Sequence, residues 1–525
     1  MAKCTVKSCN NPPYREQAEC VLHCKKNDYS TDWRSGLLSS FYDALKADIL
    51  DFLKDNDYSY NQVASFDDIA QFIDGDFSNE NIASALKGAL FIPAFIKFPA
   101  HDSRDPFNYT KLLNIFGEIH FNICEFTASH LELKGTKVFF QDCVFHYSWS
   151  LYNYSILENV NNVIYQNCIF KGSISNKSSE TDLEPYVLTE NQFDSACSFG
   201  KDLSIHNSIF EQALFNINEA SFYGVEETVM TKLDIRNTTF KDKFILNKAN
   251  ISDVYIQNCV FEGKFEFKEN LVKEFEIDNA DFLKVSDFFA TQFDLFKIKQ
   301  VKFESFAAFE DCIFGLNDNS KAEHLADFVY TTFMNFVNFR YTRFLSGLNL
   351  EKANFTQSPN FLKSEINPLY TNRETFRIIK SSFSKLENII DSNKYYSKEL
   401  EKYREELNSS NSSGFEEKLI FNLNHLLSSF GQSYLKPMGW ILVVALLHYL
   451  AVLGYENSWL YKFCEPCNEV FIVLSSFLNK VAVNILPFKA SLKEGLEFVS
   501  LIFVIGYAIL IWQVIAAFKI HTRKH

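Results

Sequence analysis

Residues 256–282 read IQNCVFEGKFEFKENLVKEFEIDNADF, and this stretch decides the fold. Its two motifs end at Phe261 and Phe282, 21 residues apart, and each has Ile five positions, Asn three positions and a small residue two positions before the Phe. A spacing of five residues fits neither an α-helix nor an ordinary β-strand. It indicates a chain that turns a corner every five residues and points one large and one small side chain inward. A similar arrangement recurs at Phe145, Phe170, Phe210, Phe240, Phe314 and Phe355, with Ile or another large apolar residue five positions before the Phe and with Asn, Asp or once Lys at the polar position.

Half of the cysteines belong to this pattern. Of the twelve in the chain, six stand two residues before a Phe: Cys124, Cys143, Cys168, Cys197, Cys259 and Cys312. A free cysteine at such a position behaves as a small buried hydrophobe. We therefore expect these six thiols to be inert packing groups, and neither metal ligands nor nucleophiles.

Three triplets match the repeat of the pentapeptide-repeat family literally: Ala249-Asn250-Ile251, Ala280-Asp281-Phe282 and Ala353-Asn354-Phe355. The chain resembles this family, in its bacterial members, over residues 116–361. The resemblance implies a mainly β fold, in which residues 116–368 form a right-handed quadrilateral β-helix, the pentapeptide-repeat solenoid, with about four pentapeptides per turn. A solenoid of this kind needs a cap at each end.

The segments that flank the repeat have helical periodicity. Residues 27–115 are expected to form an N-terminal helical cap, because a set of apolar residues there would share one helix face: Leu38, Phe41, Tyr42, Leu45, Ile49, Phe52 and Leu53. Residues 369–436 are expected to form a helical stalk with a Ser-rich linker and a juxtamembrane helix. An apolar stripe at residues 376–390 of this stalk offers a surface through which chains can associate.

The leader at residues 1–26 contains a compact set of metal ligands. Cys4, Cys9, Cys20 and His23 would supply three thiolates and one imidazole, a set that suits tetrahedral Zn²⁺. Cys24 competes with His23 for the fourth place, and we prefer His23 because its C-x2-H ending resembles the zinc-ribbon-like leaders of some bacterial repeat proteins. A segment this short buries little by itself, so structural zinc would supply its folding energy. The alternative is a reduced, flexible, Cys-rich tail.

A membrane domain is expected at residues 437–525. Residues 437–455 and 498–518 are uncharged, and each run is long enough to cross a bilayer as a helix. Basic residues after the second run (Lys519, Arg523 and Lys524) favour a cytoplasmic C-terminus, and two spans place residues 1–436 on the same side. With the bacterial resemblance, this predicts the bacterial inner (cytoplasmic) membrane. Between the runs, Cys464 and Cys467 form a C-x2-C pair to which we assign no role.

The composition argues against two classes of function. The 525 residues carry a formal net charge of −14, which disfavours general electrostatic binding to nucleic acid. The sequence lacks the motifs of P-loop and dinucleotide-binding proteins, of serine hydrolases and of zinc proteases. We therefore expect no enzyme, no catalytic residue and no cofactor other than structural zinc.

Three functions remain. The first is a membrane-anchored protein whose cytoplasmic solenoid binds an unknown protein partner or senses a signal. The second is an oligomeric ion channel or pore gated by the solenoid. A broken apolar segment between the two spans, if it lies at membrane depth, must be covered by protein or line a watery cavity, and several chains together can enclose such a cavity. The third rests on the family resemblance alone and is a DNA-mimic regulator of a type II topoisomerase, a role to which a membrane tether is ill suited. The membrane end favours a homo-oligomer in contact with the lipid bilayer.

Overall fold

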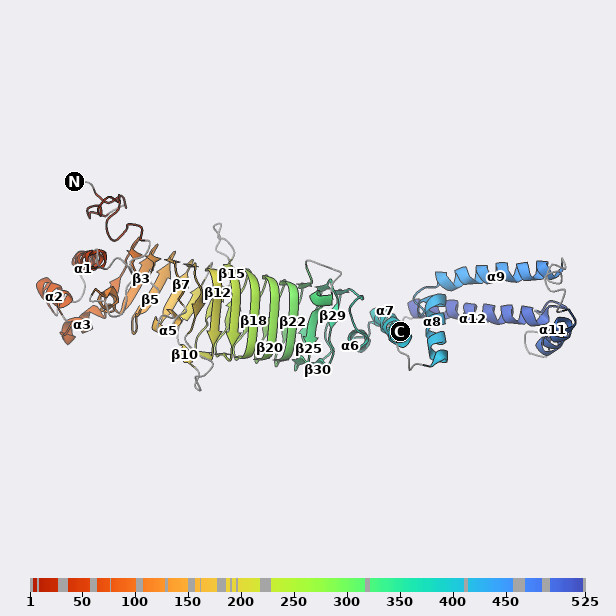
Figure 1. Ribbon diagram of the computed structural model, residues 1–525. Coiled ribbons are helices and arrows are strands. Elements are labelled where there is room, and N and C mark those ends of the chain that lie inside the picture. Colours follow the sequence, from red (N-terminus) through yellow and green to blue (C-terminus); the bar gives the residue numbers. More distant parts are fainter. Residues whose placement is uncertain are drawn as a thin grey trace. The chain divides into compact units, whose positions relative to one another are not determined.

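The computed structural model describes residues 3–6, 9–26, 36–56, 64–75, 77–100, 107–127, 131–149, 156–160, 162–176, 186–188, 191–194, 197–217, 228–316, 322–409, 414–456, 468–483 and 492–522. The chain divides into two compact units, an N-terminal unit at Met1–Thr371 and a C-terminal unit at Asn372–His525. Figure 1 shows strands throughout the first unit and helices in the second. Cys464, Cys467, Arg523 and Lys524 lie outside the described residues.

The N-terminal unit is built mainly from parallel β-strands, as the sequence predicts. One of its sheets consists of short strands, nearly all separated in sequence by strands of the other sheet. In chain order these are β1 (Leu90–Phe91), β3 (Glu118–Asn122), β5 (Lys137–Gln141), β7 (Val163–Gln166), β11 (Asn191–Asp194), β14 (Phe215–Ile217), β17 (Phe244–Leu246), β19 (Phe265–Glu266), β21 (Ser286–Asp287), β23 (Ala307–Ala308) and β27 (Val337–Asn338).

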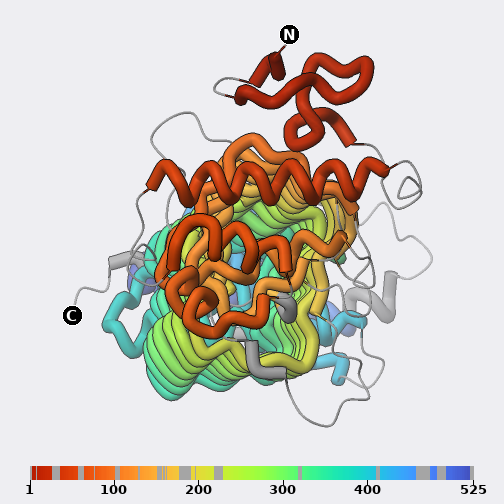
Figure 2. The backbone as a smooth tube through the Cα atoms, turned by 90° about the vertical axis from the view of Figure 1, so that its left-hand side faces the viewer, coloured from red at the N-terminus to blue at the C-terminus, as the bar shows by residue number. Residues whose placement is uncertain are grey.

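The second sheet contains the longest strands of the chain. Its strands are β2 (Lys97–Phe98), β4 (Glu125–Phe126), β6 (Val144–Phe145), β8 (Ile169–Phe170), β9 (Ile174–Ser175), β10 (Tyr186–Leu188), β12 (Ser198–His206), β13 (Ser208–Phe210), β15 (Thr228–Arg236), β16 (Thr239–Phe240), β18 (Ala249–Phe261), β20 (Leu271–Phe282), β22 (Gln292–Phe303), β24 (Ile313–Phe314), β25 (Ala326–Val329), β26 (Thr332–Phe333), β28 (Arg343–Phe344), β29 (Leu348–Asn349), β30 (Asn354–Phe355) and β31 (Glu365–Ile366). Seen from the end that carries the first helix, successive strands overlie one another (Figure 2).

The register of the long strands reproduces the 21-residue spacing of the sequence. Ile256 lies beside Ile277, and Phe261 beside Phe282, in the pairing of β18 with β20. The next pairing, of β20 with β22, places Phe303 beside Phe282. Side chains 21 positions apart in the sequence therefore lie next to each other on neighbouring strands and point to the same side of the sheet.

The phenylalanines that the sequence motif aligns fall into two separate columns of the sheet. Phe282 is followed by Phe303, and Phe314 instead continues the column of Phe293. Likewise Phe170 lies beside Phe199, so Phe210 does not follow it. The single alignment of the sequence motif was wrong here, because the same small-polar-large pattern recurs at more than one position along the strands of this sheet.

The polar residue three positions before each aligned Phe has a backbone role. Asn258 and Asn279 have φ values of 53° and 56°, in the left-handed region, and the corresponding residues of the other motifs do as well. Asn and Asp tolerate this conformation better than other non-glycine residues. Their side chains also bond along the row, since Asn258 Nδ2 donates to Asn237 Oδ1 at 3.0 Å and Asn279 Nδ2 to Asn258 Oδ1 at 2.8 Å.

The core between the sheets is largely aromatic. The Phe261 ring stacks on Phe240 and Phe282, with centroid distances of 5.0 and 4.8 Å, and meets Phe265 edge to face. The six cysteines that precede a Phe are all buried, as the sequence predicts. Burial raises the pKa of the Cys259 thiol to about 12, so it stays protonated at neutral pH.

The N-terminal helices pack against the first strands. They are α1 (Leu37–Asp55), α2 (Phe66–Asp74), α3 (Glu80–Leu86) and α4 (Tyr109–Leu113), followed later by the short α5 (Ile156–Asn159) and the 3₁₀-helix η3 (Ala322–His324). Most of the predicted apolar face of α1 is buried, whereas Tyr42 and Phe52 are half-buried. Phe41 contacts Phe98, and Phe52 contacts Phe91. The first paired strands, β1 and β2, lie within residues 27–115, the segment expected to form the helical cap.

The C-terminal unit is helical, with α6 (Arg373–Lys385), α7 (Ile389–Ser409), α8 (Phe415–Ser428), α9 (Leu435–Glu456), α11 (Asn468–Val483) and α12 (Glu497–Thr522). The stripe expected at residues 376–390 is broken, because α6 ends before Leu386 and a new helix begins at Ile389. Phe376 and Phe383 are buried against Tyr395 of α7, whereas Leu386 and Ile390 are exposed. Most of this stripe is therefore core between two helices of one chain.

Two helices of this unit, α9 and α12, are long and apolar enough to cross a membrane. Helix α9 has 22 residues and α12 has 26, which correspond to lengths of about 33 and 39 Å at about 1.5 Å per residue. His448 of α9 stacks on Phe503 of α12 with a centroid distance of 4.7 Å, so the two helices pack side by side.

Candidate metal centre

The leader folds through two tight turns that carry its ligands. The Cys9 amide donates to the Val6 carbonyl at 3.2 Å, and the His23 amide donates to the Cys20 carbonyl at 3.0 Å. A third bond, from the Cys4 amide to the Asn11 carbonyl at 3.1 Å, closes the first part of the leader on itself. These backbone bonds bring side chains separated by up to 19 positions into one small volume.

The four predicted ligands converge. The donor atoms of Cys4, Cys9, Cys20 and His23 all lie within 4.8 Å of one another. Cys4 Sγ lies 3.5 Å and Cys20 Sγ lies 3.2 Å from His23 Nδ1, and the sulfurs of Cys9 and Cys20 are 3.7 Å apart. This cluster can hold a metal ion.

The spacing of the donor atoms suits a tetrahedral ion. Metal–sulfur distances of about 2.3 Å and metal–nitrogen distances of about 2.0–2.1 Å give tetrahedron edges of roughly 3.5–3.8 Å. The distances from Cys9 to Cys20 and from Cys4 to His23 fall in this range, and the distance from Cys20 to His23, 3.2 Å, is shorter. Three sulfurs and one imidazole also form a ligand set that soft or borderline divalent ions prefer.

The electrostatics of the leader favour a neutral imidazole. Burial, and then the nearby Lys26 cation, lower the pKa of His23, so its ring is unprotonated at neutral pH and available as a ligand. Burial also raises the pKa of the Cys9 thiol to about 12 in the absence of an ion. Binding a cation here therefore releases thiol protons, which makes the affinity depend on pH.

Cys24 lies outside the cluster. Its side chain is fully buried, and its Sγ donates to the Val21 carbonyl at 3.8 Å. Of the two residues that compete for the fourth position in the sequence, only His23 points toward the three other ligands. Cys24 acts as a packing residue of the leader.

The leader also contacts the start of the second sheet. The Lys97 amide of β2 donates to the Leu22 carbonyl at 2.9 Å, one residue before His23. The ring of His23 is hydrogen-bonded to the backbone of Ala94, and such partners orient metal-binding imidazoles. Lys26 Nζ, which is buried, donates to the Leu22 carbonyl at 3.1 Å and lies over the Phe41 ring of α1. The candidate ligands therefore belong to the same packed body as the first strands.

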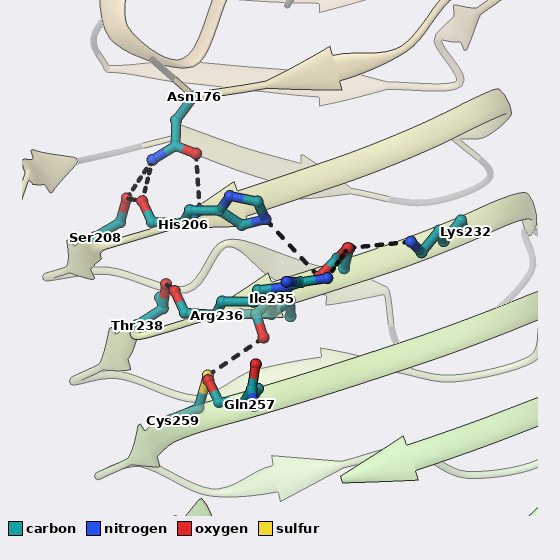
Figure 3. A network of polar contacts seen from close by, with 10 residues as sticks. Asn176, His206, Ser208, Lys232, Ile235, Arg236, Thr238, Gln257 and Cys259 are labelled. Atoms are coloured by element: carbon teal, nitrogen blue, oxygen red, sulfur yellow. Dashed lines mark hydrogen bonds and ion pairs between the residues drawn. The ribbon is translucent and has the colours of Figure 1, made fainter. Parts of the chain in front are cut away.

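A second group of charged residues lies on the outer face of the long strands (Figure 3). Arg236 Nε donates to Asp234 Oδ1 at 2.8 Å, Lys232 Nζ lies 3.1 Å from Oδ2, and His206 Nε2 lies 3.8 Å from Oδ1. Although burial opposes it, the interactions with His206, Arg236 and Lys232 hold the pKa of Asp234 well below its ordinary value. Both carboxylate oxygens of Asp234 are therefore paired with cationic side chains on the sheet.

The sequence patterns described above did not predict this network. Lys232, Asp234 and Arg236 alternate along β15, and residues two apart in a strand share a face. That alternation was readable in the sequence. The contribution of His206 comes from β12, which lies beside β15 only in the folded sheet.

No family model, curated protein or solved structure matches the chain.

Proposed function

We propose that the chain is a membrane-anchored, bacterial pentapeptide-repeat protein that presents a rigid solenoid to a protein partner or signal. The observation that carries the proposal is the in-register pairing of β15, β18, β20 and β22, which repeats one side-chain pattern every 21 residues. A right-handed quadrilateral β-helix accounts for this register, for the left-handed turn residues and for the two interleaved parallel sheets. Linear stacks of this kind offer long, ordered surfaces for partners.

The outer face of the long strands is the surface that we assign to the partner. Three side chains there form one row across neighbouring strands: Tyr255, Glu276 and Lys297. Further charged side chains flank this row along the strands, with acidic Glu274 two positions before Glu276 on β20 and basic Lys299 two positions after Lys297 on β22. A rigid sheet holds these charges at fixed spacings, so a partner with complementary charges can be selected without ordering a loop.

Photo-crosslinking tests this assignment. A benzophenone amino acid at Glu276 of the full-length protein, in the membrane of its own host, should give one discrete adduct with a different protein. The matched control carries the same group at Phe289, which is exposed but belongs to no long strand. Adducts that are identical at the two positions, or that contain only copies of this chain, would contradict the scaffold function.

The membrane part of the proposal is that α9 and α12 both cross the bilayer. Two spans return the chain to its starting side, which puts residues 1–436 and the C-terminal tail in the cytoplasm. The full-length protein should then remain in the membrane pellet after extraction at alkaline pH. In inside-out vesicles the N-terminal unit should be open to protease, and protection of that unit would reverse the orientation.

Zinc is the ion that we assign to the leader. Its tetrahedral preference and its thiolate and imidazole ligands fit Cys4, Cys9, Cys20 and His23, and its role would be structural. Reducing conditions in the cytoplasm would keep these thiols free for the ion.

One observation favours a second candidate function, an oligomeric channel. His448 lies within the α9 run, and in the described part of the chain its Nε2 is buried without a hydrogen-bond partner. Ionisable residues inside membrane spans are costly and usually serve ion or proton pathways. Ion flux in liposomes should then be measurable and should be lost in a His448→Leu variant, and the absence of flux from the unaltered oligomer would exclude the channel.

A further inference from the structure

Helix α8 has an apolar face that no described part of the C-terminal unit covers. Its exposed apolar side chains are Phe415, Leu419, Ile420, Leu423 and Leu426, with exposed fractions between 44% and 79%. At about 100° per residue, these positions fall on one side of the helix. Exposed apolar residues are ordinary when scattered, but five on one face of a short helix form a patch that marks an interaction surface.

The opposite face of α8 is fixed to α7. Tyr403 Oη donates to Glu417 Oε1 at 2.6 Å, and the Tyr403 ring meets the Phe421 ring edge to face at 5.0 Å. A further bond, from Arg404 NH1 to Asn422 Oδ1 at 3.3 Å, reaches the edge of the apolar face. These contacts hold α8 from the side of Glu417 and Phe421, and the five apolar side chains named above are exposed on the other side.

The position of α8 identifies what covers this face. The helix lies across the ends of α9 and α12 (Figure 1), and Trp440 Nε1 of α9 donates to the Leu426 carbonyl at 3.3 Å. Near the same end, the Tyr434 ring that precedes α9 stacks on Phe518 of α12 at 5.0 Å. The exposed apolar side chains of α8 therefore belong to a helix that lies at one end of the two helices that are long and apolar enough to cross a membrane.

The charges at this end agree with a lipid surface. Lys436 and Lys519 are exposed at the beginning of α9 and near the end of α12. Amphipathic helices with cations nearby lie at the boundary between lipid headgroups and acyl chains. A second copy of the chain is a poorer occupant, because one face of a 14-residue helix is small beside the roughly 800 Å² per partner that a stable interface needs.

We infer that α8 is an interfacial helix whose apolar face inserts at the cytoplasmic surface of the bilayer and holds α7 above it. This inference rests on the proposed function, in which α9 and α12 cross the same bilayer. Helix α8 would then be a second membrane contact that lies parallel to the bilayer surface, although it is too short and too polar to cross the bilayer.

Photo-crosslinking to lipid tests the inference in the full-length protein, reconstituted in vesicles of phosphatidylcholine and phosphatidylglycerol. A benzophenone amino acid is placed at Phe415 or Leu423 on the apolar face. The matched control replaces Phe421, which faces α7, and a membrane control replaces Leu446, which is exposed on α9. Adducts are identified by mass spectrometry.

We expect lipid adducts at positions 415 and 423 that exceed those at 421 several-fold, together with strong adducts at 446. Lipid adducts at 446 without an excess at 415 and 423 would overturn the interfacial helix and leave the two spans intact. Adducts at 415 and 423 with another copy of the chain would overturn it in favour of an interface between copies. Absence of lipid adducts at all four positions would overturn the proposed membrane function itself.

Discussion

Replacing Phe261 by alanine tests whether the aromatic columns hold the parallel sheets together. Phe261 is 1% exposed and contacts four other rings. It stacks on Phe240 at 5.0 Å and on Phe282 at 4.8 Å, and it meets Phe244 and Phe265 edge to face at 5.5 and 5.0 Å. The Phe261→Ala variant removes all four contacts and leaves a cavity in the centre of the stack.

The expected loss follows from these contacts. Truncation of a buried Phe to Ala costs about 3–5 kcal/mol. Each well-oriented ring pair adds about 0.5–1.5 kcal/mol beyond its buried area, so a site with four pairs belongs at the upper end of that range. In a linear stack each strand packs only on its neighbours, so distant parts of the core do not compensate.

Native-state hydrogen exchange measures this loss where it occurs. The amides of β18 and β20 should lose between about a hundredfold and a few thousandfold in protection, since every 1.4 kcal/mol is about tenfold. Phe289→Ala is the matched control, because Phe289 is 38% exposed and its truncation should change stability by about 0.5 kcal/mol or less. Protection in the Phe261→Ala variant that stays within about tenfold of this control would refute the reasoning.

Three further predictions concern the leader, the buried thiols and the pH dependence. Protein purified without chelator should hold about one equivalent of zinc by elemental analysis, and the Cys9→Ser variant should lose this zinc while the Cys24→Ala variant retains it. Metal removal should also speed hydrogen exchange of the Lys97 amide, which is hydrogen-bonded to the leader. Cys259 should resist a bulky thiol reagent at pH 8 in the native protein, because burial raises its pKa to about 12, and fast labelling would contradict its inward position. Although burial opposes it, hydrogen bonds from Lys264, Lys268 and Asn247 lower the pKa of Glu266 to about 2, below its unfolded value of about 4.3. Its contribution to stability is therefore complete above about pH 5 and lost as the pH falls toward 2, so the Glu266→Gln variant should show a weaker acid dependence of unfolding in this range.

The parallel sheets and their buried positions could be predicted from the sequence because the motif repeats locally. A small residue at Cys259 and a large one at Phe261 are both buried, as their spacing indicates. The column to which each Phe belongs could not be predicted, since Phe303 and Phe314 both stand five positions after a large apolar residue, and only strand pairing shows which one lies beside Phe282. The preference for Asn at position 258 was visible, but its cause, the left-handed backbone, is a property of the folded turn.

The candidate metal centre shows the same division. Residue type and spacing were sufficient to predict Cys4, Cys9 and Cys20, because a short leader leaves few other ways to bring thiols together. The orientation of His23 away from Cys24 depends on the turn at Cys20 and on the backbone of Ala94, more than 70 positions away. The network around Asp234 depends in the same way on β12 lying beside β15.

The constant step between strands also makes the length of the N-terminal unit an adjustable property. In the middle of the unit both sheets advance by the same 21 residues, from Phe244 to Phe265 in one and from Phe261 to Phe282 in the other. Duplication of one such segment would add a single strand to each sheet and move the two ends apart by about 4.8 Å, the distance between neighbouring strands. Selection can therefore lengthen or shorten this body in fixed increments while the end that carries the candidate metal ligands and the opposite end keep their own contacts.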